Sequence, residues 1–373
     1  MITLGSTGIT VPQNAFGALP IQRADYEEAK RILWKAYEGG ITFFDTARAY
    51  SNSEEKIGLT FGDKWKDMRS SIFIATKTMA TTPEKFWEDL ETSLKLLKTD
   101  YIDIYQFHCV SRVYKPQDGT GMYEAMLKAK EEGKIRHIGV TAHKIEIAHK
   151  CVESGLYETI QYPFSYLAAK REIELVESAK AHNMGFIAMK GLAGGLINNS
   201  RAAMAYMSQY DNVLPIWGVQ RMEELDEWLS YMDNTPVMDE EITEFIEKEQ
   251  KELMGEFCRG CGYCMPCPQD IMINQCARMS LMLRRAPSKN WLSEPMQNEM
   301  KKIINCVKCG QCISRCPYEL NTPELLKKNY EDYMNVLSGK VSVEYAVNLI
   351  FLMKKLLFLK NLILLTLKFD IIK

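Results

Sequence analysis

Residues 101–140 have the sequence YIDIYQFHCVSRVYKPQDGTGMYEAMLKAKEEGKIRHIGV, which contains a complete strand–helix–strand unit. The β-branched and aromatic runs 101–107 and 135–140 predict strands, and the amphipathic segment 121–132 between them predicts a helix. The strand runs are largely apolar, as strands covered on both faces are. A helix between two such strands indicates a parallel sheet.

The same kind of unit recurs from residue 1 to about residue 232. The predicted strands are 14–18, 41–45, 72–76, 101–107, 135–140, 159–162, 185–189 and 213–218, and helical segments include 24–38, 83–97, 121–132, 169–181 and 222–231. Eight β-α units in about 230 residues predict an α/β fold of the TIM (β/α)8 barrel type. An open doubly wound sheet is the alternative, but no G-x-G-x-x-G turn follows the first strand.

The segments outside these units predict the rest of the domain organisation. Two short apolar runs around Gly5 and Gly8 predict a hairpin that closes the base of the barrel. We place the barrel at 1–235, a packed helical connector at 236–256, a small, mostly α-helical two-cluster ferredoxin-like domain at 257–336 and a tail at 337–373. The Leu-, Ile- and Lys-rich tail has apolar runs shorter than the about 18 residues that span a bilayer. We expect it either to lie on a membrane surface or to be poorly ordered.

Four polar residues fall at the carboxyl ends of consecutive predicted strands, where the catalytic groups of a TIM barrel gather. Asp45 ends the second strand, with Tyr50 shortly after it, Lys77 follows the third strand and His108 follows the fourth. We expect Asp45 to hold Lys77 charged, and the buried ammonium to make Tyr50 a usable proton donor. His108 could then orient a substrate carbonyl. Each residue alone also fits a structural role, but their occurrence on consecutive strands favours catalysis.

Two cysteine runs dominate the last third of the chain. The runs are Cys258, Cys261, Cys264 and Cys267, and then Cys306, Cys309, Cys312 and Cys316, and each run is followed directly by a proline. The second run has the C-x2-C-x2-C-x3-C-P spacing of bacterial [4Fe–4S] ferredoxins, in which the fourth cysteine ligates the neighbouring cluster. On that pattern, Cys267 joins the first three cysteines of the second run at one cluster, and Cys316 joins the first three of the first run at the other.

The first run departs from this spacing, because two residues instead of three separate Cys264 from Cys267. Cys276 could therefore replace one of its ligands. Paired C-x-x-C motifs also make zinc sites, but four cysteines in each run exceed what one zinc ion needs per loop. Disulfides are not expected in a reducing cytosol. Cys109 and Cys151 are expected to be ordinary buried thiols.

Several segments resemble the aldo-keto reductases. They are FFDTARAY (43–50), IATK (74–77), YIDIYQFH (101–108) and GKIRHIGVT (133–141). With the cysteine-rich region added, the chain resembles the subgroup of that family that is fused to a ferredoxin domain. The resemblance implies that Asp45, Tyr50, Lys77 and His108 form a catalytic tetrad. It also implies hydride transfer between a nicotinamide nucleotide and a carbonyl or alcohol, with Tyr50 as the general acid.

The resemblance and the strand ends also give expected contacts for the nucleotide, NADH or NADPH. These residues are Thr141, His143, Gln161, Lys190, Gly194, Gly218 and Glu227. Gln161 matches the family's glutamine, whereas residues 141–143 stand where the family commonly has Ser-Asn. Around the eighth strand, where the family often has Lys and Arg for the 2′-phosphate of NADP, Arg221 is the only cation. Because Glu224 near a phosphate would be unfavourable, we expect NADH to be favoured.

The charge balance of the sequence limits the kinds of molecule that the protein is expected to bind. With 46 Lys and Arg against 48 Asp and Glu, the formal charge is −2, which leaves no cationic excess for binding nucleic acid. The first residues lead into a Gly/Thr turn rather than a basic and apolar leader, so we expect a cytoplasmic protein.

Two classes of function follow from these observations. In the first, the chain is an oxidoreductase for small carbonyl compounds, and its two [4Fe–4S] clusters either exchange electrons with a ferredoxin or flavoprotein partner or stabilise the fold. In the second, the barrel is a scaffold without turnover, and the protein is an iron–sulfur electron carrier or redox-sensing partner. Hydride transfer moves two electrons and a cluster moves one, so a direct relay needs an intermediary. The tetrad favours the first class, and the missing phosphate-binding cations favour the second.

Overall fold

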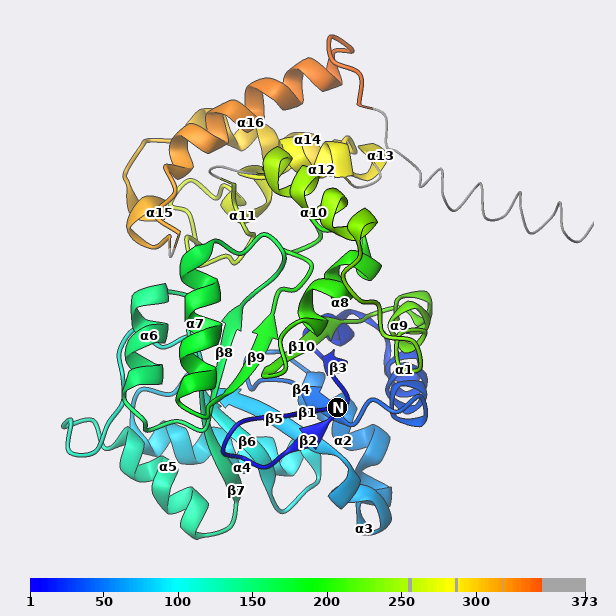
Figure 1. Cartoon of the computed structure of the whole chain (residues 1–373). Helices are drawn as coiled ribbons and strands as arrows, with labels where there is room; N and C mark the ends of the chain where they lie inside the picture. Colours follow the sequence, from blue (N-terminus) through cyan, green and yellow to red (C-terminus); the bar gives the residue numbers. More distant parts are fainter. Residues whose placement is uncertain (254–256, 286–287, 317, 344–373) are drawn as a thin grey trace, which may run out of the picture. The chain divides into compact units, whose positions relative to one another are not determined.

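A computed structural model of the chain describes residues 1–253, 257–285, 288–316 and 318–343 (Figure 1). The chain divides into two compact units, residues 1–255 and the residues from 256 onward. The tail expected at 337–373 lies outside the described residues from 344 onward. In the part of the chain that the structure describes, no helix has the length and apolar character needed to cross a membrane.

The first unit is a closed barrel of eight parallel strands in the order β10-β3-β4-β5-β6-β7-β8-β9. The strands are β3 (Ala15–Gly17), β4 (Phe43–Asp45), β5 (Phe73–Thr78), β6 (Ile102–Phe107), β7 (Ile135–Thr141), β8 (Thr159–Pro163), β9 (Gly185–Met189) and β10 (Val213–Gly218). The predicted TIM barrel is therefore confirmed. Every predicted strand is present, and the third extends through Thr78 because Lys77 and Thr78 pair with Gln106 and Phe107 of β6.

Helices surround the barrel (Figure 1). They are α1 (Tyr26–Glu38), α2 (Ser53–Phe61), α3 (Trp65–Met68), α4 (Pro83–Leu97), α5 (Met122–Glu131), α6 (Ile145–Glu153), α7 (Lys170–Ala181), α8 (Ser200–Ser208) and α9 (Met222–Leu229). Capping residues mark the starts of two of these helices. The Asp25 carboxylate accepts a hydrogen bond from the Glu28 amide at the start of α1, and Thr82 caps α4 ahead of Pro83. Their buried faces are the amphipathic faces that the sequence predicted, such as Ile32 and Leu33 of α1.

A hairpin closes one end of the barrel, as predicted. Strands β1 (Ile2–Thr3) and β2 (Thr10–Val11) are antiparallel, and Ile2, Leu4, Ile9 and Val11 are buried. These side chains form one apolar cluster with inward-facing strand residues such as Ala75 and Ile104. The plugged end is packed core, so ligands of the barrel must enter at the opposite end, where the strands finish.

Helix α10 (Glu240–Leu253) belongs to the first unit. The hydroxyl of Tyr166, in the loop after β8, donates to Glu249 Oε2 at 3.2 Å, and Gln250 Nε2 donates to the carbonyl oxygen of Tyr166 at 2.5 Å. The segment expected as a connector thus contains a helix that is held onto the barrel by specific hydrogen bonds.

The second unit is helical in its described residues. Its helices are α11 (Ile273–Cys276), α12 (Met279–Arg285), α13 (Ser288–Trp291), α14 (Glu294–Lys301), α15 (Gln311–Ser314) and α16 (Thr322–Leu337), with a 3-10 turn over Lys302–Asn305. Asn329 of α16 holds two other segments, because its Oδ1 accepts from the Ser280 amide and its Nδ2 donates to the Ala277 carbonyl oxygen. The predicted mostly α-helical domain is therefore confirmed.

Candidate active site and cluster-binding hollows

The four rim residues lie at the ends of neighbouring strands. Asp45 is the last residue of β4, Lys77 is near the end of β5, and His108 directly follows β6. Tyr50 lies in the loop between β4 and α2. Because β4, β5 and β6 are adjacent in the barrel, the fold brings these side chains to one side of its open end.

Lys77 and Asp45 form a buried ion pair. Lys77 Nζ donates to both carboxylate oxygens of Asp45, at 2.7 and 2.8 Å, and to the carbonyl oxygen of Thr46 at 2.5 Å. Burial raises the pKa of Asp45 and lowers the pKa of Lys77, and each partner opposes the shift of the other. The two groups offset each other's charge at the base of the site, and each satisfies hydrogen bonds of the other.

Tyr50 packs between Lys77 and His108. Lys77 Nζ lies 5.2 Å from the centroid of the Tyr50 ring, and the rings of Tyr50 and His108 meet edge to face with centroids 5.9 Å apart. Burial and then the charge of Asp45 raise the pKa of Tyr50 well above its usual value. From the sequence, the Lys77 ammonium is expected to favour the phenolate form of Tyr50. In the structure the carboxylate offsets the ammonium charge and burial dominates, so the phenol is held protonated.

His108 is held in its neutral form. Burial, followed by the charge of Lys77, lowers the pKa of His108 to about 3. Within the described part of the chain, its buried Nδ1 atom has no hydrogen-bond partner. A buried ring nitrogen without a partner is a group that a bound ligand could satisfy.

A buried carboxylate that the sequence analysis did not single out fixes the loop that carries Tyr50. Glu54 of α2 is 1% exposed, forms an ion pair with Arg48, and accepts hydrogen bonds from Thr76 Oγ1 at 2.6 Å and Ser93 Oγ at 2.7 Å. The Arg48 amide also donates to the Lys77 carbonyl oxygen at 3.0 Å. These bonds tie the Tyr50 loop to β5 and α4. The only sequence signal was an acidic residue in the first turn of a helix.

Three of the expected nucleotide contacts lie at the same open end. Gln161 of β8 reaches across the barrel, where its Nε2 approaches Asp45 Oδ1 at 3.5 Å and its Oε1 accepts from Gln106 Nε2 at 3.0 Å. Thr141 ends β7, and its Oγ1 accepts from the Cys109 amide at 2.7 Å. His143 follows it, 8% exposed, and burial, Lys190 and His108 lower its pKa well below the usual value. Gln161 thus contacts the ion pair itself, and Thr141 and His143 lie at and just after the end of the neighbouring strand β7.

The other expected nucleotide contacts are spread over the loops after β9 and β10. Lys190 and Gly194 have positive φ angles of 59° and 68° in the loop after β9, and Gly218 ends β10. Glu227 lies on α9, where it accepts a hydrogen bond from Ser200 at the start of α8. The structure thus places Glu227 in a helix–helix contact, while its expected contact with the nucleotide stays a prediction.

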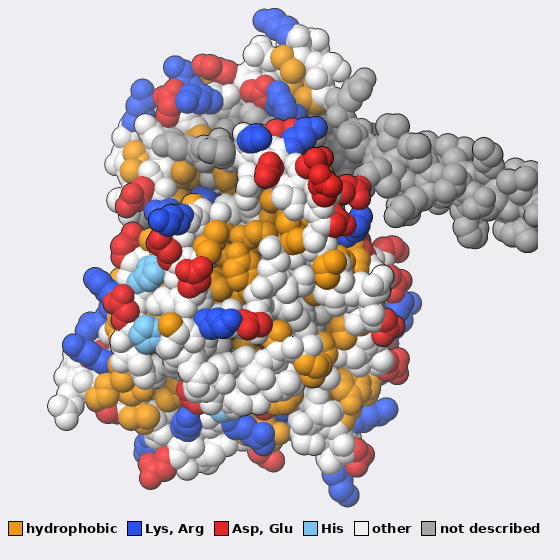
Figure 2. All heavy atoms as spheres, in the orientation of Figure 1, with side chains coloured by type: hydrophobic (Ala, Val, Ile, Leu, Met, Phe, Trp, Pro, Cys, Tyr) orange, Lys and Arg blue, Asp and Glu red, His pale blue; other side chains and the backbone are white. Residues whose placement is uncertain are grey.

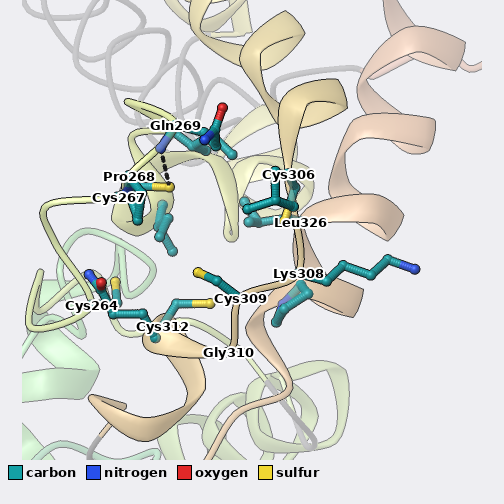
Figure 3. Close-up of a pocket in the computed structure, with 15 residues that line it drawn as sticks. Cys264, Cys267, Pro268, Gln269, Cys306, Lys308, Cys309, Gly310, Cys312 and Leu326 are labelled. Carbon is teal, nitrogen blue, oxygen red and sulfur yellow. Dashed lines mark hydrogen bonds between the residues drawn. The ribbon is translucent and has the colours of Figure 1, made fainter.

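The thiols of the second unit surround two hollows. One, which we name the Cys309 hollow, has an empty volume of about 390 Å³ including its mouth and is lined by Cys264, Cys267, Cys306, Cys309 and Cys312. Figure 3 shows the sulfur atoms of Cys267, Cys306, Cys309 and Cys312 around a common space. The other, the Cys258 hollow, has an empty volume of about 360 Å³ and is lined by Cys258, Cys261, Cys264 and Cys316.

This grouping matches the crossed pattern that the cysteine spacing predicted. Cys267 lies with the thiols of the second run, and Cys316 lies with those of the first. Cys276 lines neither hollow; it is fully buried, and its thiol faces the Glu299 carbonyl oxygen at 4.0 Å. Cys276 is therefore packed away from both hollows in this structure, while Cys264 and Cys267 line them, and the ligand set of the first run stays a prediction.

The donor set fits iron–sulfur clusters. Each hollow offers at least four thiols, which is the ligand number of a [4Fe–4S] cluster. Thiolates that bind a zinc ion stand about 2.3 Å from the metal and converge on one point. Among the described residues, no three His, Cys, Asp or Glu side chains converge as the ligands of one ion do. Burial raises the pKa of Cys264 to about 12 and also raises that of Cys258, so their thiolate forms would need nearby positive charge, which bound iron would supply.

Comparison with protein families identifies the family to which the barrel domain belongs. Residues 11–209, more than half of the chain, match the model described as the aldo/keto reductase family. The chain belongs to that family. Residues 257–321 match the model described as a 4Fe-4S dicluster domain, so this aldo/keto reductase carries an iron–sulfur domain after its barrel.

Relatives of this aldo/keto reductase include two proteins of Bacillus subtilis. The uncharacterized oxidoreductase YrpG is 31% identical over 222 residues, which cover 52% of this chain and 67% of that protein. The aldo-keto reductase YhdN is 32% identical over 212 residues, which cover 52% of this chain and 62% of that protein. The chain thus spans about two thirds of the length of these relatives. An aldo-keto reductase structure from Bacillus halodurans shares the fold, with a TM-score of 0.58 and 22% identity, over 68% of this chain and 97% of that one.

Cys109 of this aldo/keto reductase corrects one expectation. From the sequence, Cys109 and Cys151 are both expected to be ordinary buried thiols. Cys151 is fully buried on α6, but Cys109 is partly exposed and follows His108 with a φ angle of 55°. Its thiol is close enough to Tyr50 and Lys77 to raise the pKa of each. The apolar strand before Cys109 hid this location, because only the closed barrel turns the chain after β6 toward the ion pair.

Proposed function

We propose that this aldo/keto reductase catalyses hydride transfer between a nicotinamide nucleotide and a small-molecule carbonyl or alcohol. The observation that carries the proposal is the Lys77–Asp45 ion pair, buried beneath Tyr50 and His108 at the open end of the barrel. The nucleotide, when bound, supplies the hydride for a carbonyl carbon. The residues of the chain provide the proton and the orientation.

Tyr50 acts as the general acid in this proposal. In the reducing direction, its phenol donates the proton to the carbonyl oxygen as that oxygen gains negative charge, so an alcohol forms. Lys77, 5.2 Å from the ring centroid, stabilises the phenolate that remains. Neutral His108 offers a ring N–H to the same oxygen, and which nitrogen carries the proton depends on the tautomer. In the oxidising direction the same groups take the proton back.

The geometry of α9 supports a preference for NADH. Arg221, the first cation along the chain after the end of β10, donates from Nε and Nη2 to Glu224 Oε1 at 2.9 and 2.7 Å. Glu224 Oε2 accepts from the Gln220 and Arg221 amides at the start of the helix. The guanidinium and the helix terminus are thus both occupied by a carboxylate of the chain, which would repel a 2′-phosphate.

We further propose that the second unit holds two [4Fe–4S] clusters. One is bound by Cys267, Cys306, Cys309 and Cys312 in the Cys309 hollow, and the other by Cys258, Cys261, Cys264 and Cys316 in the Cys258 hollow. Bound clusters would supply one-electron transfer. Cys309 is exposed, so a ferredoxin or flavoprotein partner in the cytoplasm could exchange electrons at that hollow. On the face drawn in Figure 2, Lys and Arg side chains are interspersed with Asp and Glu, which fits small-molecule and protein partners better than nucleic acid.

The test is Tyr50→Phe in anaerobically purified full-length protein. Loss of the phenolic proton should lower kcat for carbonyl reduction by about 10²- to 10⁴-fold, with iron and sulfide content unchanged. Tyr37→Phe is the matched control, because Tyr37 lies on α1 and its hydroxyl contacts Ser71, away from the strand ends. Unchanged carbonyl turnover in Tyr50→Phe would remove the catalytic assignment and favour the electron-carrier function of a barrel without turnover.

A further inference from the structure

A buried arginine lies behind the first cysteine run. Arg278 sits between α11 and α12 and is 6% exposed. An arginine is rarely buried to this extent, because removing its charge from water is costly unless negative charge or good acceptors surround it. Its Nη2 donates to Met282 Sδ at 3.0 Å, and that thioether is a weak acceptor. The guanidinium keeps its proton in proteins, so the fold holds a permanent positive charge at this point.

The guanidinium is packed directly against the loop that carries Cys258. Gly260, between Cys258 and Cys261, has a φ angle of 66°, and a Cβ atom there would lie 2.3 Å from Arg278 Nη1. The left-handed backbone favours glycine at this position, and the end of the guanidinium lies against it. The Gly260 amide donates to Cys258 Sγ at 3.4 Å, which ties the same residue to the thiol.

Arg278 and Cys258 act on each other electrostatically. Burial raises the pKa of Cys258, and Arg278 is among the groups that oppose this rise. Burial also lowers the pKa of Arg278, and Cys258 opposes that shift. The two groups are therefore within electrostatic range of each other in an environment where water screens little.

The cations near the Cys309 hollow are placed differently. Lys308 lines that hollow, but its side chain is exposed and extends away from the sulfur atoms (Figure 3). Lys302 pairs with Asp270 and Glu299 at 2.7 and 2.9 Å. A solvated ammonium acts weakly on a nearby cluster, whereas a cation removed from water acts more strongly.

We propose that Arg278 raises the reduction potential of the [4Fe–4S] cluster held in the Cys258 hollow. Reduction adds one negative charge to the cluster, and a fixed buried cation stabilises the reduced form more than the oxidised form. Arg278 is thus a positioning residue that sets where an electron resides between the two clusters. The inference rests on the proposed cluster content of the second unit.

The experiment is a redox titration of full-length, anaerobically purified protein followed by EPR, with Arg278→Met, Arg278→Lys and Arg284→Met. Arg278→Met should lower the midpoint potential of one cluster by at least ~59 mV. For a one-electron couple, this shift is a tenfold change in the ratio of reduced to oxidised cluster at a given potential. Arg278→Lys keeps the charge and should stay near the wild-type midpoint. Arg284 is the control, because it lies on α12 in a surface ion pair with Asp332, and its loss should shift neither midpoint.

The outcomes separate the inference from the proposed function. Iron and sulfide counts on the wild-type protein test the clusters, and their absence would remove the proposed clusters and this inference together. Loaded clusters with unchanged midpoints in Arg278→Met would overturn the role of Arg278 alone. If Arg278→Met fails to bind its clusters, Arg278→Lys decides the question. Clusters with a wild-type midpoint potential in Arg278→Lys would support the role of the positive charge. A lowered midpoint potential, or failure to bind clusters, would contradict that role.

Discussion

The open end of the barrel and the cysteine-rich unit both remove ionisable groups from water, but they compensate for the lost hydration differently. In the barrel, opposite charges of the chain meet: Lys77 bonds to both oxygens of Asp45, and Gln161 adds a contact to the same carboxylate. In the second unit, like groups gather, and neighbouring thiols raise the pKa of Cys264 further after burial has raised it. The charged groups of the barrel site therefore compensate one another within the chain, whereas thiolates in the hollows would be stabilised by the positive charge of bound iron.

Removing iron should give the largest effect and test this difference directly. We expect chelation of the full-length protein to unfold the second unit, since the thiol-lined hollows lose the groups that hold them together, while the barrel keeps a cooperative thermal transition. Limited proteolysis with mass spectrometry would then show new cleavage confined to the region after residue 256. Equal protection of that region before and after chelation would mean that helix packing alone, such as that of Asn329, maintains the unit.

Lys77→Met should strongly destabilise the barrel. It leaves the Asp45 carboxylate buried without its cation, which costs about 3–5 kcal/mol, and it should also abolish carbonyl turnover. Chemical denaturation that reports on the barrel measures the loss. The control is Lys170→Met, because Lys170 pairs with Glu174 on the surface of α7 and should contribute at most about 1 kcal/mol. A loss in Lys77→Met no greater than that of the control would show that the barrel does not depend on the pair.

Acid should weaken the barrel through its buried histidines. The unfolded chain protonates His108 below about pH 6.5, whereas the folded barrel does so only near pH 3, so the stabilisation is complete above pH 6.5 and is lost as the pH falls toward 3. This group alone should remove about 2 kcal/mol at pH 5, and His143 adds a contribution of the same sign.

Denaturation of His108→Gln across this pH range measures the contribution of His108. The slope of stability against pH should become smaller in this variant, while exposed His182→Gln on the barrel surface should leave it unchanged. An unaltered slope in His108→Gln would show that the imidazole is hydrated in the folded protein.

Glu224→Gln should have the smallest effect. The substitution releases Arg221 from its ion pair, and a surface pair of this kind is worth up to about 1 kcal/mol, so binding of NADPH relative to NADH should improve by at most about fivefold. Nucleotide titrations measure the ratio, with Glu223→Gln on the same helix as the control. Tighter binding of NADPH than NADH by the wild-type protein would contradict the proposed preference before any substitution is made.

The sequence by itself determined the barrel and the general position of both candidate sites. The spacing of apolar residues that marks a strand or a helix is a local pattern, so eight β-α units could be recognised in the sequence. A barrel built from such units places the carboxyl ends of all its strands at one rim. Asp45, Lys77 and His108 could therefore be placed together before any contact was known. The cysteine spacing likewise indicated the exchange of Cys267 and Cys316 between the two hollows, because that pattern is local to each run.

Only the tertiary structure decided which other groups act on these sites. Arg278 against Gly260, Glu54 beneath the Tyr50 loop, and Cys109 beside Tyr50 are contacts between segments that no local period connects. The location of Cys276 away from both hollows was likewise settled by packing, through its approach to Glu299. Spacing along the chain fixes which residues share a strand, a helix face or a loop. Burial and charge compensation depend on which of these elements meet in three dimensions, and that is decided when the whole core packs.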